Sequence, residues 1–250
     1  MYDQARALAY LQAQYNSGFQ LCREAPIFPD TYWTCNDNAL AVRAFDRLGD
    51  FEKRDAICRK LQSVRLFGHD AFKNNGWVDP FVHKPDLLPT LVRGAQCYQA
   101  PYTQPKTCVA GSLGVWHEEA NDGGMMDELE YFTLACARAL SYHKQRRLYS
   151  RVGVVRLIQG MWDGTGFTGK GFDRLHYQTM NLSLFLLLGA KCGWPTEFTL
   201  RNTVEVRLAD KQLPSGGTCT WYTTGTERDT EGNTENTALH AYAMVRPVDY

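Results

Sequence analysis

Apolar residues recur along this chain at helical spacing, in segments that alternate between two kinds. Four segments are amphipathic and carry charged residues at intervals, and they cover residues 5–15, 51–66, 149–161 and 198–213. The other four are more apolar and richer in small residues, and we expect them near residues 34–48, 126–143, 176–191 and 232–245. A helix with one polar face lies at a surface, whereas a helix that is apolar on most sides is buried. The pattern therefore predicts alternating outer and inner helices.

A glycine junction separates each outer helix from the inner helix that follows it. The four junctions are Gly18-Phe19, Gly76-Trp77, Gly166-Phe167 and Gly216-Gly217. One helical hairpin cannot bury its own apolar face, so units of this kind must stack on one another. The sequence thus predicts an all-α fold, an α/α toroid of about four helical hairpins. Because no linker-like composition interrupts the repeats, we expect a single domain over residues 1–250.

The second hairpin contains one long loop insertion, at about residues 78–117. The insertion is rich in proline and holds two of the cysteines. Loops of this length in compact domains are usually lids, binding loops or unstructured segments. We predict that it folds over the mouth of the toroid as a partial lid, with Trp77 and Trp116 at its two ends. A decorative surface loop is the alternative.

Two features of the chain resemble known helical toroids. A Gly-Phe junction, then an acid and an aromatic before an Ala/Leu-rich helix, resembles the repeats of the terpenoid cyclases and protein prenyltransferases. It is also similar to the α/α barrels of six-hairpin glycoside hydrolases and polysaccharide lyases. The pattern REAP...YW..NDNAL, which begins at Arg23, is similar to a feature of some uncharacterised toroidal proteins. These motifs are structural, so the resemblance implies a fold more than an activity. The DxDD and DDxxD motifs of terpene cyclases are absent from the sequence.

Charge and hydropathy narrow the range of partners. The chain has 27 Lys and Arg against 27 Asp and Glu, and no basic stripe, so nucleic acid and anionic membranes are poor candidates. The longest apolar run, residues 182–190, is too short to span a bilayer. The N-terminal residues lack the charged start and apolar core of a signal peptide, so we expect a cytoplasmic protein, although a secreted chain without its leader would look the same. A small molecule or an oligosaccharide is the expected ligand, and the oligomeric state is not predicted.

The cysteines and histidines do not indicate a metal site. Of the 8 cysteines, Cys22 with Cys35 and Cys97 with Cys108 flank loops that a disulfide could close, but without a signal peptide we expect reduced thiols. Protein prenyltransferases hold zinc with an Asp-x-Cys pair and a distant histidine. Here Cys35 and Asp37 stand in the reverse order, with His240 near the end of the chain. We therefore expect no metal and no cofactor.

In a toroid, the loops that lead into the inner helices surround one mouth of the central cavity. Residues at these positions are the candidates for a site, although acids and amides at a helix N-terminus are also common caps. The catalytic candidates are Glu24, Asp37, Glu130, His176 and Glu235. The candidates for ligand binding are Tyr32, Trp33, Asn38, Trp77, Asp127, Tyr177, Asn181, Trp221 and Glu231.

Tryptophan and tyrosine beside carboxylates are typical of sugar sites. An apolar wall raises the pKa of a carboxylic acid and prepares it as a general acid, and glycoside cleavage requires two carboxyl groups. In this role Glu24 and Asp37 are the best-placed acid and base. The resemblance to polysaccharide lyases implies a second chemistry, in which His176 and Tyr177 with Arg174 remove a proton alpha to a uronic carboxylate.

We therefore predict an enzyme that uses carboxylate and histidine acid–base chemistry in an aromatic-lined cavity, a hydrolase or lyase acting on a glycan or uronide. One alternative is a terpenoid-type cyclase, dehydratase or isomerase, in which aromatic rings stabilise cations. The other is a non-catalytic binding or scaffold domain.

Overall fold

The inner helices occupy the expected parts of the chain. The computed structural model describes residues 1–27, 33–63, 71–72, 107–109, 115–117, 128–144, 146–170 and 172–245. Within these residues the inner helices are α2 (Cys35–Leu48), α6 (Phe132–Lys144), α8 (Thr179–Cys192) and α10 (Thr234–Met244), and a short 3₁₀ helix η1 (Glu128–Glu130) precedes α6. The outer helices are α1 (Gln4–Gln14), α3 (Phe51–Ser63), α7 (Leu148–Gly160) and α9 (Arg201–Ala209). The alternation of amphipathic and apolar segments therefore located these helices to within a few residues at most ends.

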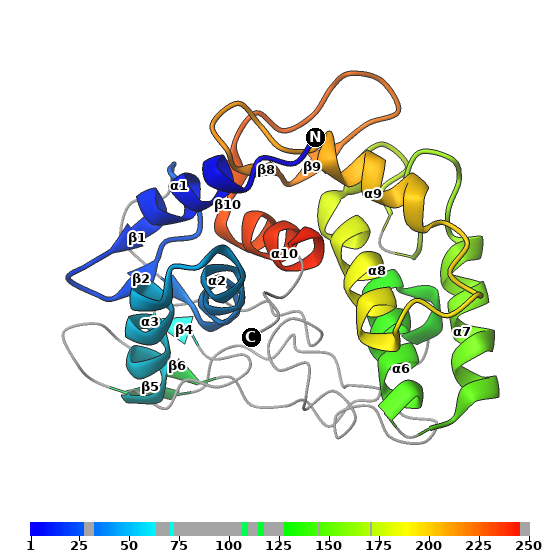
Figure 1. Ribbon diagram of the computed structural model, residues 1–250, viewed down its shortest axis with the longest axis horizontal. Helices are drawn as coiled ribbons and strands as arrows, with labels where there is room; N and C mark the ends of the chain where they lie inside the picture. Colours follow the sequence, from blue (N-terminus) through cyan, green and yellow to red (C-terminus); the bar gives the residue numbers. More distant parts are fainter. Residues whose placement is uncertain are drawn as a thin grey trace.

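The inner helices pack side by side in the order α2, α10, α8, α6, and the outer helices cover them. Helix α3 lies against α2, α9 against α8 and α7 against α6, while α1 contacts both α2 and α10. Figure 1 shows the result as an arc of helices in two layers, with α2 and α6 at its two ends. The arc agrees with the two layers of a toroid, and we propose that it forms most of such a ring.

The core lies between the two layers. Most of α8 is buried, as expected for a helix that is apolar on all sides. Phe167, which follows the third glycine junction, is 2% exposed, and its ring packs against Phe132 of α6 and Phe185 of α8. The aromatic residue of this junction therefore joins two inner helices in the core and does not line the rim.

Short antiparallel strands precede three of the inner helices. Strand β3 (Trp33–Thr34) leads into α2, β7 (Tyr177–Gln178) into α8 and β10 (Gly232–Asn233) into α10. Strand β7 pairs with β9 (Trp221–Tyr222), β10 with β8 (Thr218–Cys219), and β1 (Tyr15–Asn16) with β2 (Leu21–Cys22). The hydrophobic pattern did not predict these strands, because a strand of two residues is too short to show a periodicity of two.

Part of the predicted insertion belongs to a small sheet at the entry to α2. The strand order is β3–β4–β6–β5, where β4 is Ala71–Phe72, β6 is Val115–His117 and β5 is Thr107–Val109. The backbone of residues 107–109 and 115–117 is thereby linked to the strand that leads into an inner helix. The rest of the insertion and Trp77 lie outside the described residues, so the lid stays a prediction.

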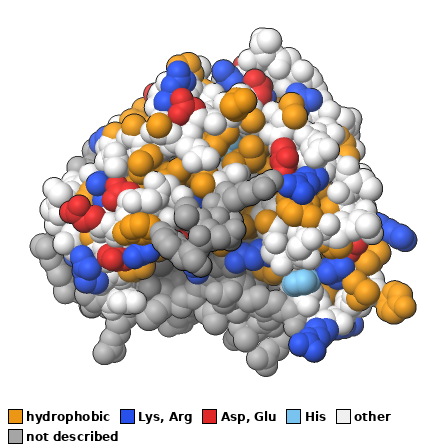
Figure 2. Space-filling model, in the orientation of Figure 1, with side chains coloured by type: hydrophobic (Ala, Val, Ile, Leu, Met, Phe, Trp, Pro, Cys, Tyr) orange, Lys and Arg blue, Asp and Glu red, His pale blue; other side chains and the backbone are white. Residues whose placement is uncertain are grey.

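The described cysteines are all free thiols: Cys22, Cys58, Cys136, Cys192 and Cys219. The disulfide considered between Cys22 and Cys35 is therefore not formed, while the side chains of Cys97 and Cys108 lie outside the described part. None of the helices in the described part is both long enough and apolar enough to cross a membrane. On the face drawn in Figure 2, basic and acidic side chains are scattered among apolar ones over the described surface.

Candidate functional site

The pairing of β7 with β9 creates the best-defined group of predicted site residues. In this ladder Tyr177 lies opposite Tyr222, and Gln178 lies opposite Trp221. His176 stands directly before β7, and its ring meets the indole of Trp221 edge-on, with the ring centroids 4.6 Å apart. Two candidates that are 45 positions apart in the sequence thus meet at the entrance to α8.

Asp173 holds the His176 ring in one orientation. Its Oδ2 lies 2.7 Å from His176 Nδ1, and its Oδ1 accepts hydrogen bonds from the backbone N–H groups of His176 at 2.7 Å and Leu175 at 2.8 Å. The hydrogen bonds from the backbone and the ring of His176 lower the pKa of Asp173 to about 2. An ionised carboxylate can only accept hydrogen bonds, so Nδ1 carries the proton and Nε2 of the neutral ring is the basic atom. An oriented histidine of this kind is the usual arrangement for a general base.

Tyr177 points away from His176. Its hydroxyl donates to Asp163 Oδ2 at 2.5 Å, and its ring stacks on Tyr222 with centroids 5.4 Å apart. Neighbouring residues of a strand face opposite sides, which explains why the two side chains separate. Burial, together with the hydrogen bond to Asp163, raises the pKa of Tyr177 to about 12. Burial would raise the pKa of Asp163, but the hydrogen bonds from Tyr177, Thr165 and Gly166 outweigh it and lower that pKa. The structure therefore places Tyr177 in a supporting contact behind His176.

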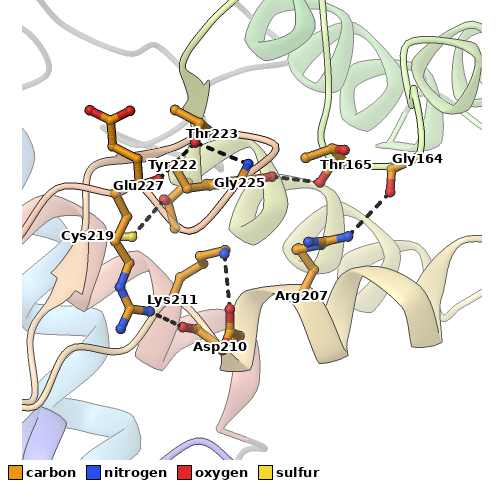
Figure 3. A network of polar contacts seen from close by, with 12 residues as sticks. Gly164, Thr165, Arg207, Asp210, Lys211, Cys219, Tyr222, Thr223, Gly225 and Glu227 are labelled. Carbon is orange, nitrogen blue, oxygen red and sulfur yellow. Dashed lines mark hydrogen bonds and ion pairs between the residues drawn. The ribbon is translucent and has the colours of Figure 1, made fainter.

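A network of polar contacts fixes the strand that carries Trp221 (Figure 3). The hydroxyl of Tyr222 donates to the carbonyl of Thr165 at 3.1 Å, and Arg207 donates to the carbonyl of Gly164 at 3.4 Å. The ammonium of Lys211 lies 4.3 Å from the centre of the Tyr222 ring. The loop after α7, the end of α9 and strand β9 are thus tied together behind the site.

Gly166 allows this close packing. A Cβ atom at this position would lie 2.4 Å from the ring of Tyr177 and 2.6 Å from the hydroxyl of Tyr222. The glycine of the third junction is therefore required where two aromatic side chains approach the backbone.

Arg174 lies in the same turn as Asp173 and His176, and it is exposed. Its φ angle of 71° is in the left-handed region, which a residue with a side chain rarely adopts. Within the described part of the chain Arg174 forms no ion pair. Its positive charge therefore remains available to an anionic group near His176.

The predicted site residue Asn38 serves the fold, and so does Asn233, which was not predicted. The amide of Asn38 spans the backbone of Cys22: its Oδ1 accepts from Cys22 N at 2.7 Å, and its Nδ2 donates to Cys22 O at 3.0 Å. Asn233 is the N-cap of α10, where its side chain accepts from the backbone N–H of Asn236. These amides satisfy backbone groups, as caps and clamps do.

The predicted acids are distributed over separate parts of the structure. The carbonyl of Glu24 accepts from Thr234 N at 2.6 Å, which brings Glu24 to the start of α10, where Glu235 lies half-buried in the first turn. Asp37 is 4% exposed in the first turn of α2. Glu130 is exposed and lies 3.4 Å from Lys170 in an ion pair.

Within the described part of the chain, no hydrogen bond, ion pair or ring contact joins the remaining candidates to His176. Glu231 is exposed before β10, and Asn181 is half-buried in α8. Tyr32, Trp77, Asp127 and the side chain of Trp33 lie outside the described residues. The structure thus assembles His176 and Trp221, and it places Glu24 beside the helix that carries Glu235.

Asp173 and Asp163 orient the residues of the site, and neither was predicted from the sequence. The available signal for Asp173 was its spacing, because an Asp three residues before a His can form a turn and reach the ring. Asp163 lies 14 residues before its partner Tyr177 and offered no comparable signal.

No group of three or more His, Cys, Asp or Glu side chains in the described part is arranged to hold a metal ion. Comparison of the chain with protein-family models, with curated proteins and with solved structures returned no match. The function must therefore be inferred from the site itself.

Proposed function

We propose that the protein is a lyase that acts on a uronide, with His176 as the general base. The observation that carries this proposal is the pair formed by Asp173 and His176 beside the indole of Trp221. The carboxylate fixes the tautomer, so that Nε2 can accept a proton. The indole offers an apolar surface on which a sugar ring can stack, and Arg174 supplies a positive charge in the same turn.

The reaction that fits these groups is β-elimination. His176 Nε2 removes the proton at the carbon that bears the uronic carboxylate, and Arg174 neutralises the negative charge that develops on that carboxylate. The electron pair of the broken C–H bond forms a C=C bond, and the glycosidic C–O bond at the next carbon breaks. The departing oxygen takes a proton from His176 or from water, and an unsaturated uronide is the product.

Hydrolysis has less support at this site. A glycoside hydrolase requires two carboxyl groups on opposite sides of the bond that is cleaved. Here Asp173 is bonded to His176, and Asp163 is bonded to Tyr177. Both nearby acids are thus committed to orienting other side chains, which favours histidine-dependent elimination.

A non-catalytic carbohydrate-binding domain is the second candidate. It is favoured by the structural roles of Asn38 and Asn233, which agree with the cap interpretation of the rim. The isoprenoid alternative has no comparable support among the contacts around His176.

The test is an elimination assay on short oligouronides, followed by the ultraviolet absorbance of the unsaturated product. We expect the wild-type protein to form this product and His176→Gln to reduce the rate by 10²-fold or more, about the contribution of a general base. Arg174→Gly should also lower the rate, while a matched exchange at another exposed arginine with positive φ, Arg146→Gly, should not. Binding of the oligouronide without product would favour the binding domain. If the protein neither binds the oligouronide nor forms the product, both proposals are refuted.

A further inference from the structure

A second group of side chains lies at the opposite end of the inner helices. Arg47 is in the last turn of α2, Lys191 is in the last turn of α8, and Tyr242 is near the end of α10. His176 precedes the first residue of α8, so the length of this helix, about 20 Å, separates the two places. This second group is independent of the proposed lyase activity.

Arg47 and Lys191 converge on one aromatic ring. The guanidinium carbon of Arg47 lies 5.3 Å from the centroid of the Tyr242 ring, and Nζ of Lys191 lies 5.8 Å from the same centroid. Three neighbouring inner helices thus contribute one residue each. Arg47 is half-buried, and Lys191 is exposed to solvent.

Neither cation has an acidic partner in the described part of the chain, where the ion pairs involve other residues. In addition, Nη1 of Arg47 is buried and has no hydrogen-bond partner among the described groups. A buried donor without an acceptor is costly and rare in native proteins, and an absent ion or water is a common explanation.

The helix dipole explains only part of this arrangement. A cation in the last turn is stabilised by the negative end of its helix, which accounts for the sign of the charge on α2 and on α8. The dipole does not require the two cations to meet at one ring, and it does not supply an acceptor for the buried Nη1. A bound anion would account for the meeting of the two cations at one ring, and it would supply the acceptor for Nη1.

We propose that Arg47 and Lys191 bind a phosphate group beside the ring of Tyr242. The guanidinium offers two parallel donors to phosphate oxygens, and the ammonium adds a second charge, so the pair matches a phosphate dianion. Inorganic phosphate and a phosphate monoester are both sources of this group, since both present the same oxygens.

The experiment is a calorimetric titration of the full chain with inorganic phosphate and, separately, with glucose 6-phosphate, at constant ionic strength set with sodium chloride. We expect saturable binding, and the tighter of the two ligands identifies the source of the phosphate. Arg47→Gln and Lys191→Gln should each weaken binding about tenfold or more. Arg156→Gln, which removes an exposed charge from α7, should leave binding unchanged.

Arg47→Lys is a second variant that keeps the test valid if Arg47→Gln does not fold. It keeps the charge but loses the second donor, so it should fold and bind more weakly than the wild type. The proposal is overturned if the wild-type protein shows no saturable binding of either ligand. It is equally overturned if Arg156→Gln weakens binding as much as Arg47→Gln does.

Discussion

Replacement of Gly216 by alanine is expected to destabilise the protein by more than about 3 kcal/mol. Gly216 has a φ angle of 92°, in the left-handed region, and a Cβ atom built on it lies 2.2 Å from the carbonyl oxygen of Arg6. The obstacle is the backbone of α1, which cannot turn aside as a flexible side chain would. The variant must therefore strain its own backbone and also displace α1 from the turn before β8.

Gly164→Ala is the matched control for this prediction. Gly164 also has a left-handed φ angle, 100°, but a Cβ atom there has no neighbour within 4 Å. The Gly164→Ala variant should be destabilised only by the unfavourable left-handed backbone angle of alanine, by about 1–2 kcal/mol. Urea denaturation of the two variants measures the difference. Equal losses would show that the contact between Gly216 and α1 is not part of the folded protein.

Acid is expected to unfold the protein through His240. This residue of α10 is completely buried; its Nδ1 lies 2.9 Å from Thr218 Oγ1, and its ring lies 4.4 Å from the ring of Tyr2. Burial lowers the pKa of His240 to about 3, from an ordinary value of 6.5. The unfolded chain thus takes up a proton at a higher pH than the folded chain does. The stability contributed by the neutral ring is complete above pH 6.5 and is lost as the pH falls towards 3, by at most about 1.4 kcal/mol per pH unit.

The free energy of unfolding measured between pH 4 and pH 8 tests this expectation. His240→Gln should be less stable at pH 8 but should show a flatter pH dependence, because its side chain does not titrate. A wild-type slope that His240→Gln leaves unchanged would contradict the assignment.

The helices were predictable because each carries a repeated signal. Helix α8 has a continuous apolar run, α3 and α9 carry charges at intervals, and Gly49 and Gly193 have the left-handed φ angles typical of a residue that ends a helix. Spatial neighbours were harder to predict. The order α2, α10, α8, α6 depends on contacts between segments far apart in the chain, which no local pattern encodes.

Contacts between distant segments also limited what could be predicted of the candidate site. The position just before an inner helix singled out His176, but its contact with Trp221 results from the pairing of two-residue strands. The expected partnership of His176 with Tyr177 was not found, because adjacent strand residues face opposite sides and Tyr177 turns to Asp163. The ring of Phe167 lies in the core, a position that the Gly-Phe junction alone did not predict because it does not show which way the ring points.

The most direct test of the proposed site is an NMR titration of the protein with a short oligouronide, observed at the tryptophan indole N–H groups. The signal of Trp221 is expected to shift in a saturable manner, together with the ring signals of His176. Trp194, which packs against Phe198 and Arg201 away from this rim, should not change. A titration that shifts Trp194 and leaves Trp221 unchanged, or that shifts neither, would contradict a uronide site at the entrance to α8.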